Sequence, residues 1–223
     1  MKMVRTFSLL AAAIVMIVAA PASAGLDSRT ADPAPDIAYG NPGAGPGPVG
    51  PADITVPLVV AGSPITSIAT LEIVLNITHP YVGDHNPITL TKVGGPSITL
   101  LAKPGSLDGD GFGSGSNYCA AFPITYTDTA ILPSEAQTGG GATDCVGDGT
   151  PSVYLASDQA GVASSLNAAF AGVDFNGTWE LSIVDDFPYT GGTLNSYTIS
   201  VTPEPATLGL LGLGAIALIR RRR

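Results

Sequence analysis

The chain has 223 residues, among them 28 glycines and 19 prolines, and a formal net charge of −9 at pH 7. This length suits one domain, or two small ones, together with segments that serve export. Residues 25–202 hold three fixed cations against 17 acidic side chains, a formal charge of −14, and such a surface argues against nucleic-acid binding because it repels phosphate backbones.

The first 24 residues have the pattern of a cleavable signal peptide. Lys2 and Arg5 precede an apolar run over residues 7–20, and small residues follow up to Ala24. A basic start, a short apolar run and a small-residue exit together predict export, with cleavage by signal peptidase after Ala24. Residues 25–51 come next, with many prolines and glycines and no apolar periodicity, so we expect a spacer there.

From residue 52 onward the sequence is typical of an antiparallel β domain. Short runs of Val, Ile, Thr and Leu alternate with Gly, Pro, Asn and Asp, and every second residue is large and apolar in 71–77 and 179–183. The pattern predicts at most a turn or two of helix within 160–171. It predicts strands near 54–60, 68–78, 88–91, 97–101, 152–155, 178–184 and 197–202. We therefore predict an all-β fold, a sandwich or jelly roll, for residues 52–202.

The chain has two cysteines, Cys119 and Cys145. Both fall in the part predicted to be exported, where the surroundings are oxidising and an even count favours pairing. Neither belongs to a C-x-x-C pair, which argues against zinc ligation by cysteine. We therefore predict a disulfide bond between them.

Two blocks of sequence resemble the P domain, also called P/Homo B. The first covers residues 77–84 and continues through 88–90 and 98–100, and the second covers residues 176–186 and 192–197. The resemblance implies a jelly-roll β-sandwich, which normally follows the subtilisin-like catalytic domain of proprotein convertases. The sequence has no Asp-Thr-Gly, His-Gly-Thr-His or Gly-Thr-Ser-Met-Ala segment, so we expect no catalytic activity.

The chain also departs from the P-domain pattern. His85 replaces the usual Leu after Gly-Asp, and Asn86-Pro87 adds a residue before the next strand. Tyr197 replaces a frequent Trp. Thr190 stands where an Asp is frequent, which removes a carboxylate near the closing loop.

Carboxylates at four positions match family carboxylates and are candidate calcium ligands: Asp84, Asp128, Asp185 and Asp186. Oxygen ligands from separate loops are what calcium requires. The loop 108–113 alternates carboxylates but lacks the remaining EF-hand ligands. His79, Asp84 and His85 also suggest a metal site or a base with its orienting group. We expect His79 and Asp84 instead to secure a strand and its turn, since both fall on the P-domain motif.

The C-terminus resembles a PEP-CTERM sorting tail. Pro203, Glu204 and Pro205 are followed by an apolar run over 206–219 and then by Arg220, Arg221, Arg222 and Arg223. As a helix the apolar run would span about 21 Å, short of a hydrocarbon core of ~30 Å. This predicts a transient inner-membrane anchor whose arginines stay cytoplasmic; a stable single-span anchor is the alternative. The resemblance implies cleavage by an exosortase in an exopolysaccharide-producing Gram-negative bacterium.

These features leave three classes of function. The first is a non-catalytic cell-surface or matrix protein whose P-like domain has a structural or binding role, with exopolysaccharide as a partner. The second is an accessory module that binds or stabilises a separately encoded subtilisin-like protease. The third, a self-contained hydrolase, lacks an identifiable pair of nucleophile and base.

Overall fold

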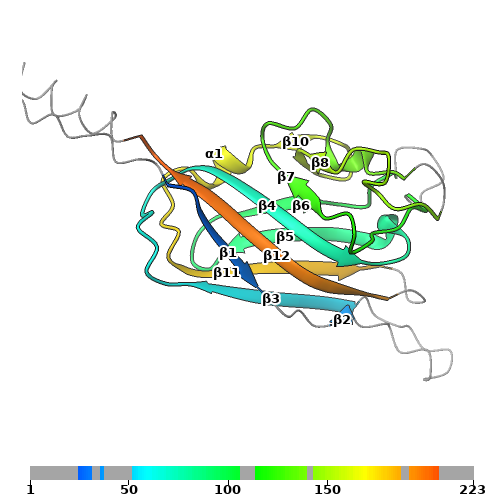
Figure 1. The fold of residues 1–223 in the computed structure, drawn as a ribbon, viewed down its shortest axis with the longest axis horizontal. Helices are drawn as coiled ribbons and strands as arrows, with labels where there is room; N and C mark the ends of the chain where they lie inside the picture. Colours follow the sequence, from blue (N-terminus) through cyan, green and yellow to red (C-terminus); the bar gives the residue numbers. More distant parts are fainter. Residues whose placement is uncertain are drawn as a thin grey trace, which may run out of the picture.

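Two β-sheets packed face to face form the body of the computed structural model, which describes residues 25–31, 36–37, 52–105, 114–139, 143–186 and 191–205 (Figure 1). The first sheet has the strand order β1-β12-β4-β7-β8, and β2 also pairs with β12. Its strands are β1 (Asp27–Ala31), β2 (Asp36–Ile37), β4 (Ile68–Thr78), β7 (Ile124–Tyr126), β8 (Val153–Tyr154) and β12 (Gly192–Pro203).

The second sheet has the order β3-β11-β5-β6. Its strands are β3 (Ala52–Val60), β5 (His85–Lys92), β6 (Ser97–Leu101) and β11 (Gly177–Asp185). Pro57 lies in β3, which within this sheet pairs with β11 alone; an edge strand tolerates a residue without a backbone N–H.

Short elements complete the described part of the chain. They are the 3-10 helices η1 (Val82–Asp84) and η3 (Ser134–Ala136), the paired strands β9 (Ala156–Ser157) and β10 (Ala163–Ser164), and the helix α1 (Leu166–Phe170). Among the described residues, no helix has the length and apolar character needed to cross a bilayer.

Alternation of buried and exposed residues along the strands builds the core between the two sheets. In β4 the buried residues are Ile68, Leu71, Ile73, Leu75 and Ile77, and in β11 they include Trp179, Leu181 and Ile183. Successive side chains of a strand point to opposite faces, so each strand has one buried face. The prediction of an all-β sandwich is thus confirmed.

A buried hydroxyl group ties the two sheets together. The Tyr197 hydroxyl in β12 donates to the Val56 carbonyl in β3 over 2.9 Å. The Trp179 ring is fully buried against Phe170 and Phe175, and its Nε1 donates to the Phe175 carbonyl. Both polar atoms of these large aromatic side chains therefore have partners inside the core.

The segment that we expected to be a spacer begins with a strand. Residues 27–31 form β1, which pairs antiparallel with the last strand, β12. Ser28 and Thr30 are exposed and pair their hydroxyls with Ser200 and Thr198, each at 2.8 Å. Because β1 covers the edge of β12 with a polar sequence, it lacks the apolar alternation by which strands are predicted.

Cys119 and Cys145 form a disulfide bond, as predicted. The bond joins two segments that also share backbone hydrogen bonds, from the Asn117 N–H to the Asp144 carbonyl and from the Val146 N–H to the Asn117 carbonyl. It therefore fixes a pairing that the backbone makes in any case.

Candidate functional site

A cluster of buried polar side chains closes one end of the core. His79, Asp84 and Asp185 each place one ligand atom within 4.8 Å of the others, and His85 packs against His79 with ring centroids 4.4 Å apart. Their exposed fractions are 0% for both histidines, 7% for Asp84 and 2% for Asp185. We call these four residues the His–Asp cluster.

The same alternation that builds the core points His79 and Asp185 inward. His79 directly follows β4 and continues its series of buried residues after Ile77, while Asp185 ends β11 two residues after Ile183. His79 Nε2 and Asp185 Oδ2 lie 3.1 Å apart. The cluster thus occupies positions where the sequence pattern would otherwise place apolar side chains, and it bridges the two sheets.

A β-bulge turns His85 into the core. His85 pairs with Asp185 and Ile88 pairs with Ile183, so β5 has one residue more than β11 between these two pairs. In a regular strand, two residues three positions apart, such as His85 and Ile88, would point to opposite faces of the sheet; the bulge lets both face inward. Asn86-Pro87, the insertion noted in the sequence, supplies it.

The turn before β5 brings Asp84 to the cluster. Residues Val82–Asp84 form η1, whose three residues are all buried. The Gly83 N–H donates to the Ser114 carbonyl, and the Asp84 carbonyl accepts from the Asp186 N–H over 2.9 Å. These backbone bonds fix Asp84 between the ends of the two sheets.

The surroundings of the cluster are closely packed. The Tyr118 ring stacks on His85, with centroids 5.4 Å apart, and its hydroxyl donates to Gln137 Oε1. A Cβ on Gly192 would lie 2.5 Å from Cδ2 of the His79 ring, so no side chain fits at that position without displacing the imidazole. The cluster is therefore enclosed by rigid neighbours.

The electrostatics of His85 follow from its burial. Burial, and next the neighbouring His79, lower the pKa of His85 well below its usual value, so its imidazole is neutral at neutral pH. Both His85 nitrogens lack a hydrogen-bond partner within the described residues, as does Nδ1 of His79. An unsatisfied buried donor of this kind costs about 1–3 kcal/mol.

Asp128 has a different task from the other candidate calcium ligands. Its carboxylate accepts hydrogen bonds from the Ser165 hydroxyl and from the Leu166 and Asn167 N–H groups, at the start of α1. Asn167 in turn accepts from the Leu71 N–H near the start of β4. His79 lies beyond the other end of β4, about 25 Å away at the rise of a strand. The four predicted carboxylates therefore do not form one site.

Asp186 lies beside the cluster but points away from it. Its side chain is exposed and accepts a hydrogen bond from Asn86 Nδ2 over 2.8 Å. The structure thus unites Asp84 and Asp185 with two histidines rather than with the other predicted carboxylates. The expectation that His79 and Asp84 secure a strand and its turn fits their backbone bonds; the position of His85 depends on the bulge.

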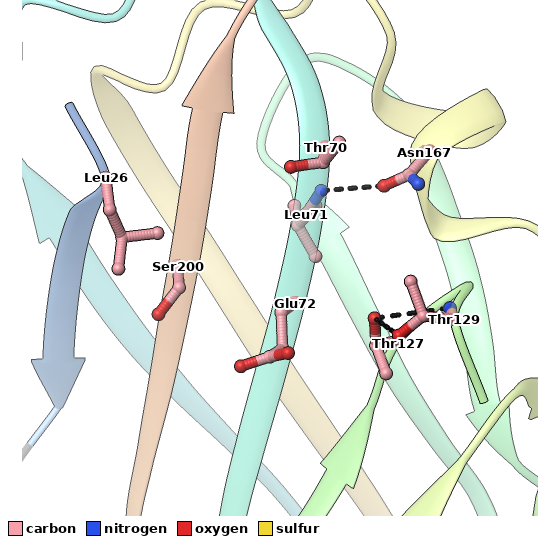
Figure 2. Close-up of a pocket in the computed structure, with 8 residues that line it drawn as sticks. All are labelled: Leu26, Thr70, Leu71, Glu72, Thr127, Thr129, Asn167 and Ser200. Atoms are coloured by element: carbon pink, nitrogen blue, oxygen red, sulfur yellow. Dashed lines mark hydrogen bonds between the residues drawn. The ribbon is translucent and has the colours of Figure 1, made fainter. Parts of the chain in front are cut away.

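A second feature is a shallow depression on the outer face of the first sheet. Figure 2 shows the Glu72 side chain between β4 and β12, with the Ser200 hydroxyl on the neighbouring strand. Hydroxyls pair across this face, for example Thr70 with Thr202 at 2.6 Å. The depression is lined by Leu26, Thr70, Leu71, Glu72, Thr127, Thr129, Asn167 and Ser200. Its lining offers hydrogen-bonding groups and one carboxylate.

The sorting tail begins where the last strand ends. Pro203 is the final residue of β12 and pairs with Ile68. The Glu204 N–H donates to the Ser67 carbonyl over 3.0 Å, while the side chains of Glu204 and Pro205 are exposed. The predicted signal peptide with Ala24, the loop 108–113, the apolar run 206–219 and Arg220, Arg221, Arg222 and Arg223 lie outside the described residues.

The structure therefore defines an all-β sandwich whose last strand leads into a short polar motif at the surface. Residues 201–223 match the model of the PEP-CTERM protein-sorting motif. This motif indicates exosortase-dependent export to the cell surface, as the sequence predicted. None of the curated proteins matches the chain.

Two solved structures of an Aeromonas sobria serine protease are among those similar to the chain. In the complex of the protease with its chaperone, the matched chain has a TM-score of 0.36 and 15% identity, over 82% of this chain and 28% of that one. For the protease alone the values are 0.34 and 12%, over 81% and 27%. The chain spans less than a third of the length of these matched chains.

Proposed function

We propose that this is a non-catalytic protein of the cell surface or extracellular matrix, which an exosortase sorts through its C-terminal tail. The observation that carries the proposal is the junction of the sorting motif with the sandwich. β12 runs through the core and ends at Pro203, the first residue of the Pro-Glu-Pro sequence. A folded domain is thus attached directly to its sorting signal.

The geometry of the junction suits recognition by a processing enzyme. Proline lacks a backbone N–H, so two prolines stop the β ladder and keep the chain extended. The Glu204 N–H is bound to Ser67 while its carboxylate faces solvent. Recognition of this carboxylate therefore requires no unfolding of the last strand.

We also propose that the sandwich is a P-like domain. In support, the two blocks of sequence that resemble the P domain meet in space, where His79 of the first contacts Asp185 of the second. The subtilisin catalytic segments are absent from the sequence. The buried His79 ring also has no hydroxyl bound to Nδ1 among the described residues, as a nucleophile paired with a base would require.

The outer face of the first sheet is the surface that we propose for binding exopolysaccharide. The hydroxyls of threonine and serine side chains, the Glu72 carboxylate and the Asn167 amide line its depression, and such groups exchange hydrogen bonds with sugar hydroxyls. The alternative partner is a separately encoded subtilisin-like protease, to which a P-like domain would bind as an accessory module. Retention on the native polysaccharide, as opposed to co-purification of a protease, separates these two roles.

The sorting role is tested by replacing Glu204 with Ala in the full chain, expressed in cells that possess an exosortase. The substitution keeps the backbone bond to Ser67 and removes only an exposed carboxylate. We expect the Glu204→Ala precursor to be exported through its N-terminal signal and then to accumulate uncleaved in the inner membrane, since the apolar run and the arginines remain.

Glu180→Gln, which changes an acid on the other sheet, is the matched control and should be processed like the wild type. The readouts are the intact mass of the protein and its distribution between inner membrane, outer envelope and medium. A wild-type protein found at full length in the inner membrane, with the same mass and fractionation as Glu204→Ala, would support a permanent anchor and defeat the sorting proposal.

A further inference from the structure

Three buried imidazole nitrogens in the His–Asp cluster lack a hydrogen-bond partner within the described residues: Nδ1 of His79 and both nitrogens of His85. A neutral imidazole offers one donor and one acceptor, and buried polar groups are nearly always satisfied. His85 is fully buried, shares the inner face of the sheet with its cross-strand partner Asp185, and lies against the His79 ring. The cluster therefore combines imidazole nitrogens that lack a partner among the described residues with the buried carboxylates of Asp84 and Asp185.

We propose that this cluster binds a divalent transition-metal ion, zinc above all, through His79, Asp84 and Asp185, with His85 as the fourth ligand. The three ligand atoms already lie within 4.8 Å of one another. The 3.1 Å between His79 Nε2 and Asp185 Oδ2 is close to the ~3.3 Å edge of a tetrahedron with metal–ligand bonds of about 2.0–2.1 Å. Coordination by all four ligands would require the side chains of Asp84 and His85 to turn toward this pair.

The choice of zinc over calcium follows from the donor set. Calcium takes 6–8 oxygen ligands, whereas imidazole nitrogen together with carboxylate oxygen suits zinc and its neighbours. Two of the carboxylates expected for calcium are used elsewhere, Asp128 at the start of α1 and Asp186 with Asn86.

The surroundings point to a structural ion. Four ligands from the protein in a buried cluster leave no open coordination position for a substrate. The ion would join the end of β4 in one sheet to β5 and β11 in the other, and Tyr118 and Gly192 hold the imidazole rings in place. The site would therefore stabilise the sandwich. This inference does not depend on the sorting role.

The test uses the full chain expressed with its own export signals, purified, stripped with a chelator and titrated separately with zinc and calcium ions. We expect one zinc ion per chain. At free zinc 100-fold above the dissociation constant, the thermal midpoint should rise by about 5–10 °C. Calcium at the same concentrations should not shift the midpoint.

Variants assign the ligands. Asp185→Asn should abolish the zinc shift, and His85→Leu should weaken zinc binding about 10- to 100-fold while filling the space of the ring. Asp186→Asn, next in sequence but exposed, is the matched control and should bind zinc like the wild type. If Asp185→Asn does not fold, the zinc affinity of His85→Leu tests the assignment of ligands. Leucine suits this buried position, so we expect that variant to fold.

Three results would overturn the proposal. One is the absence of any zinc shift in the wild type, which would leave the cluster as a His79–Asp185 pair beside a packed imidazole. Another is a zinc shift that Asp185→Asn and His85→Leu both retain in full, which would place the ion at the acidic surface. The third is a shift with calcium and none with zinc.

Discussion

Removal of the disulfide bond tests how the sandwich is stabilised. The double variant Cys119→Ser/Cys145→Ser opens a link between residues 26 positions apart. In the chain-entropy model this costs about 3.5 kcal/mol, because the unfolded chain gains conformational freedom. At about 2–4 °C per kcal/mol for a domain of this size, the thermal midpoint should fall by about 7–14 °C.

The folded state should survive this change. The segment around Asn117 and Tyr118 remains attached by backbone hydrogen bonds to Asp144, Val146 and His79, and the core between the two sheets does not involve the cysteines. We therefore expect the far-ultraviolet circular dichroism at 25 °C to be unchanged while the midpoint falls.

Thermal melts of the double variant, of the wild type and of the wild type with reductant are the measurements. Reductant should reproduce the effect of the double variant and should have no further effect on it. An unchanged midpoint would contradict the entropic estimate. Loss of β structure at 25 °C would instead show that the bond, and not the sandwich core, is the main source of stability.

Two further predictions follow from single side chains. Asp128→Ala removes three hydrogen bonds at the start of α1 and should lower the free energy of unfolding by about 2 kcal/mol. Unfolding in denaturant measures this loss, with Asp148→Ala, at an exposed position, as the control. An equal loss in both variants would refute the capping role of Asp128. Burial raises the pKa of Tyr154 to about 12, and it also raises the pKa values of Tyr118, Tyr126 and Tyr197 above the usual value of 10. The folded state keeps these protons at pH values where the unfolded state has lost them. The contribution of these tyrosines to the free energy of unfolding is therefore fully present below pH 10, and it is lost as the pH rises through their pKa values in the folded state. Denaturant midpoints that stay constant above pH 10 would contradict this.

Periodicity made much of the fold predictable from the sequence. β4 and β6 begin and end where the alternation placed them, and β3, β5, β11 and β12 extend the predicted strands by a few residues. β1 was missed because Asp27–Ala31 is a polar edge strand, and β7 because three residues are too short to show a period. Strand pairing, not local pattern, defines these two elements.

The sequence by itself determined the C-terminal sorting motif, the strands with one buried face and the pair of cysteines, because each depends on local composition or on a count. The tertiary structure decided which carboxylates meet. Asp128 and Asp185 are both aspartates that the sequence offered as calcium ligands. Asp128 caps α1, whereas Asp185 contacts His79, which lies 106 residues away in the chain. His85 shares the core-facing side of β5 with Ile88 because a bulge lies between these two residues. The packing of distant segments decides which face a residue beside a bulge points to and which side chains meet between the sheets. A local sequence pattern therefore does not predict either.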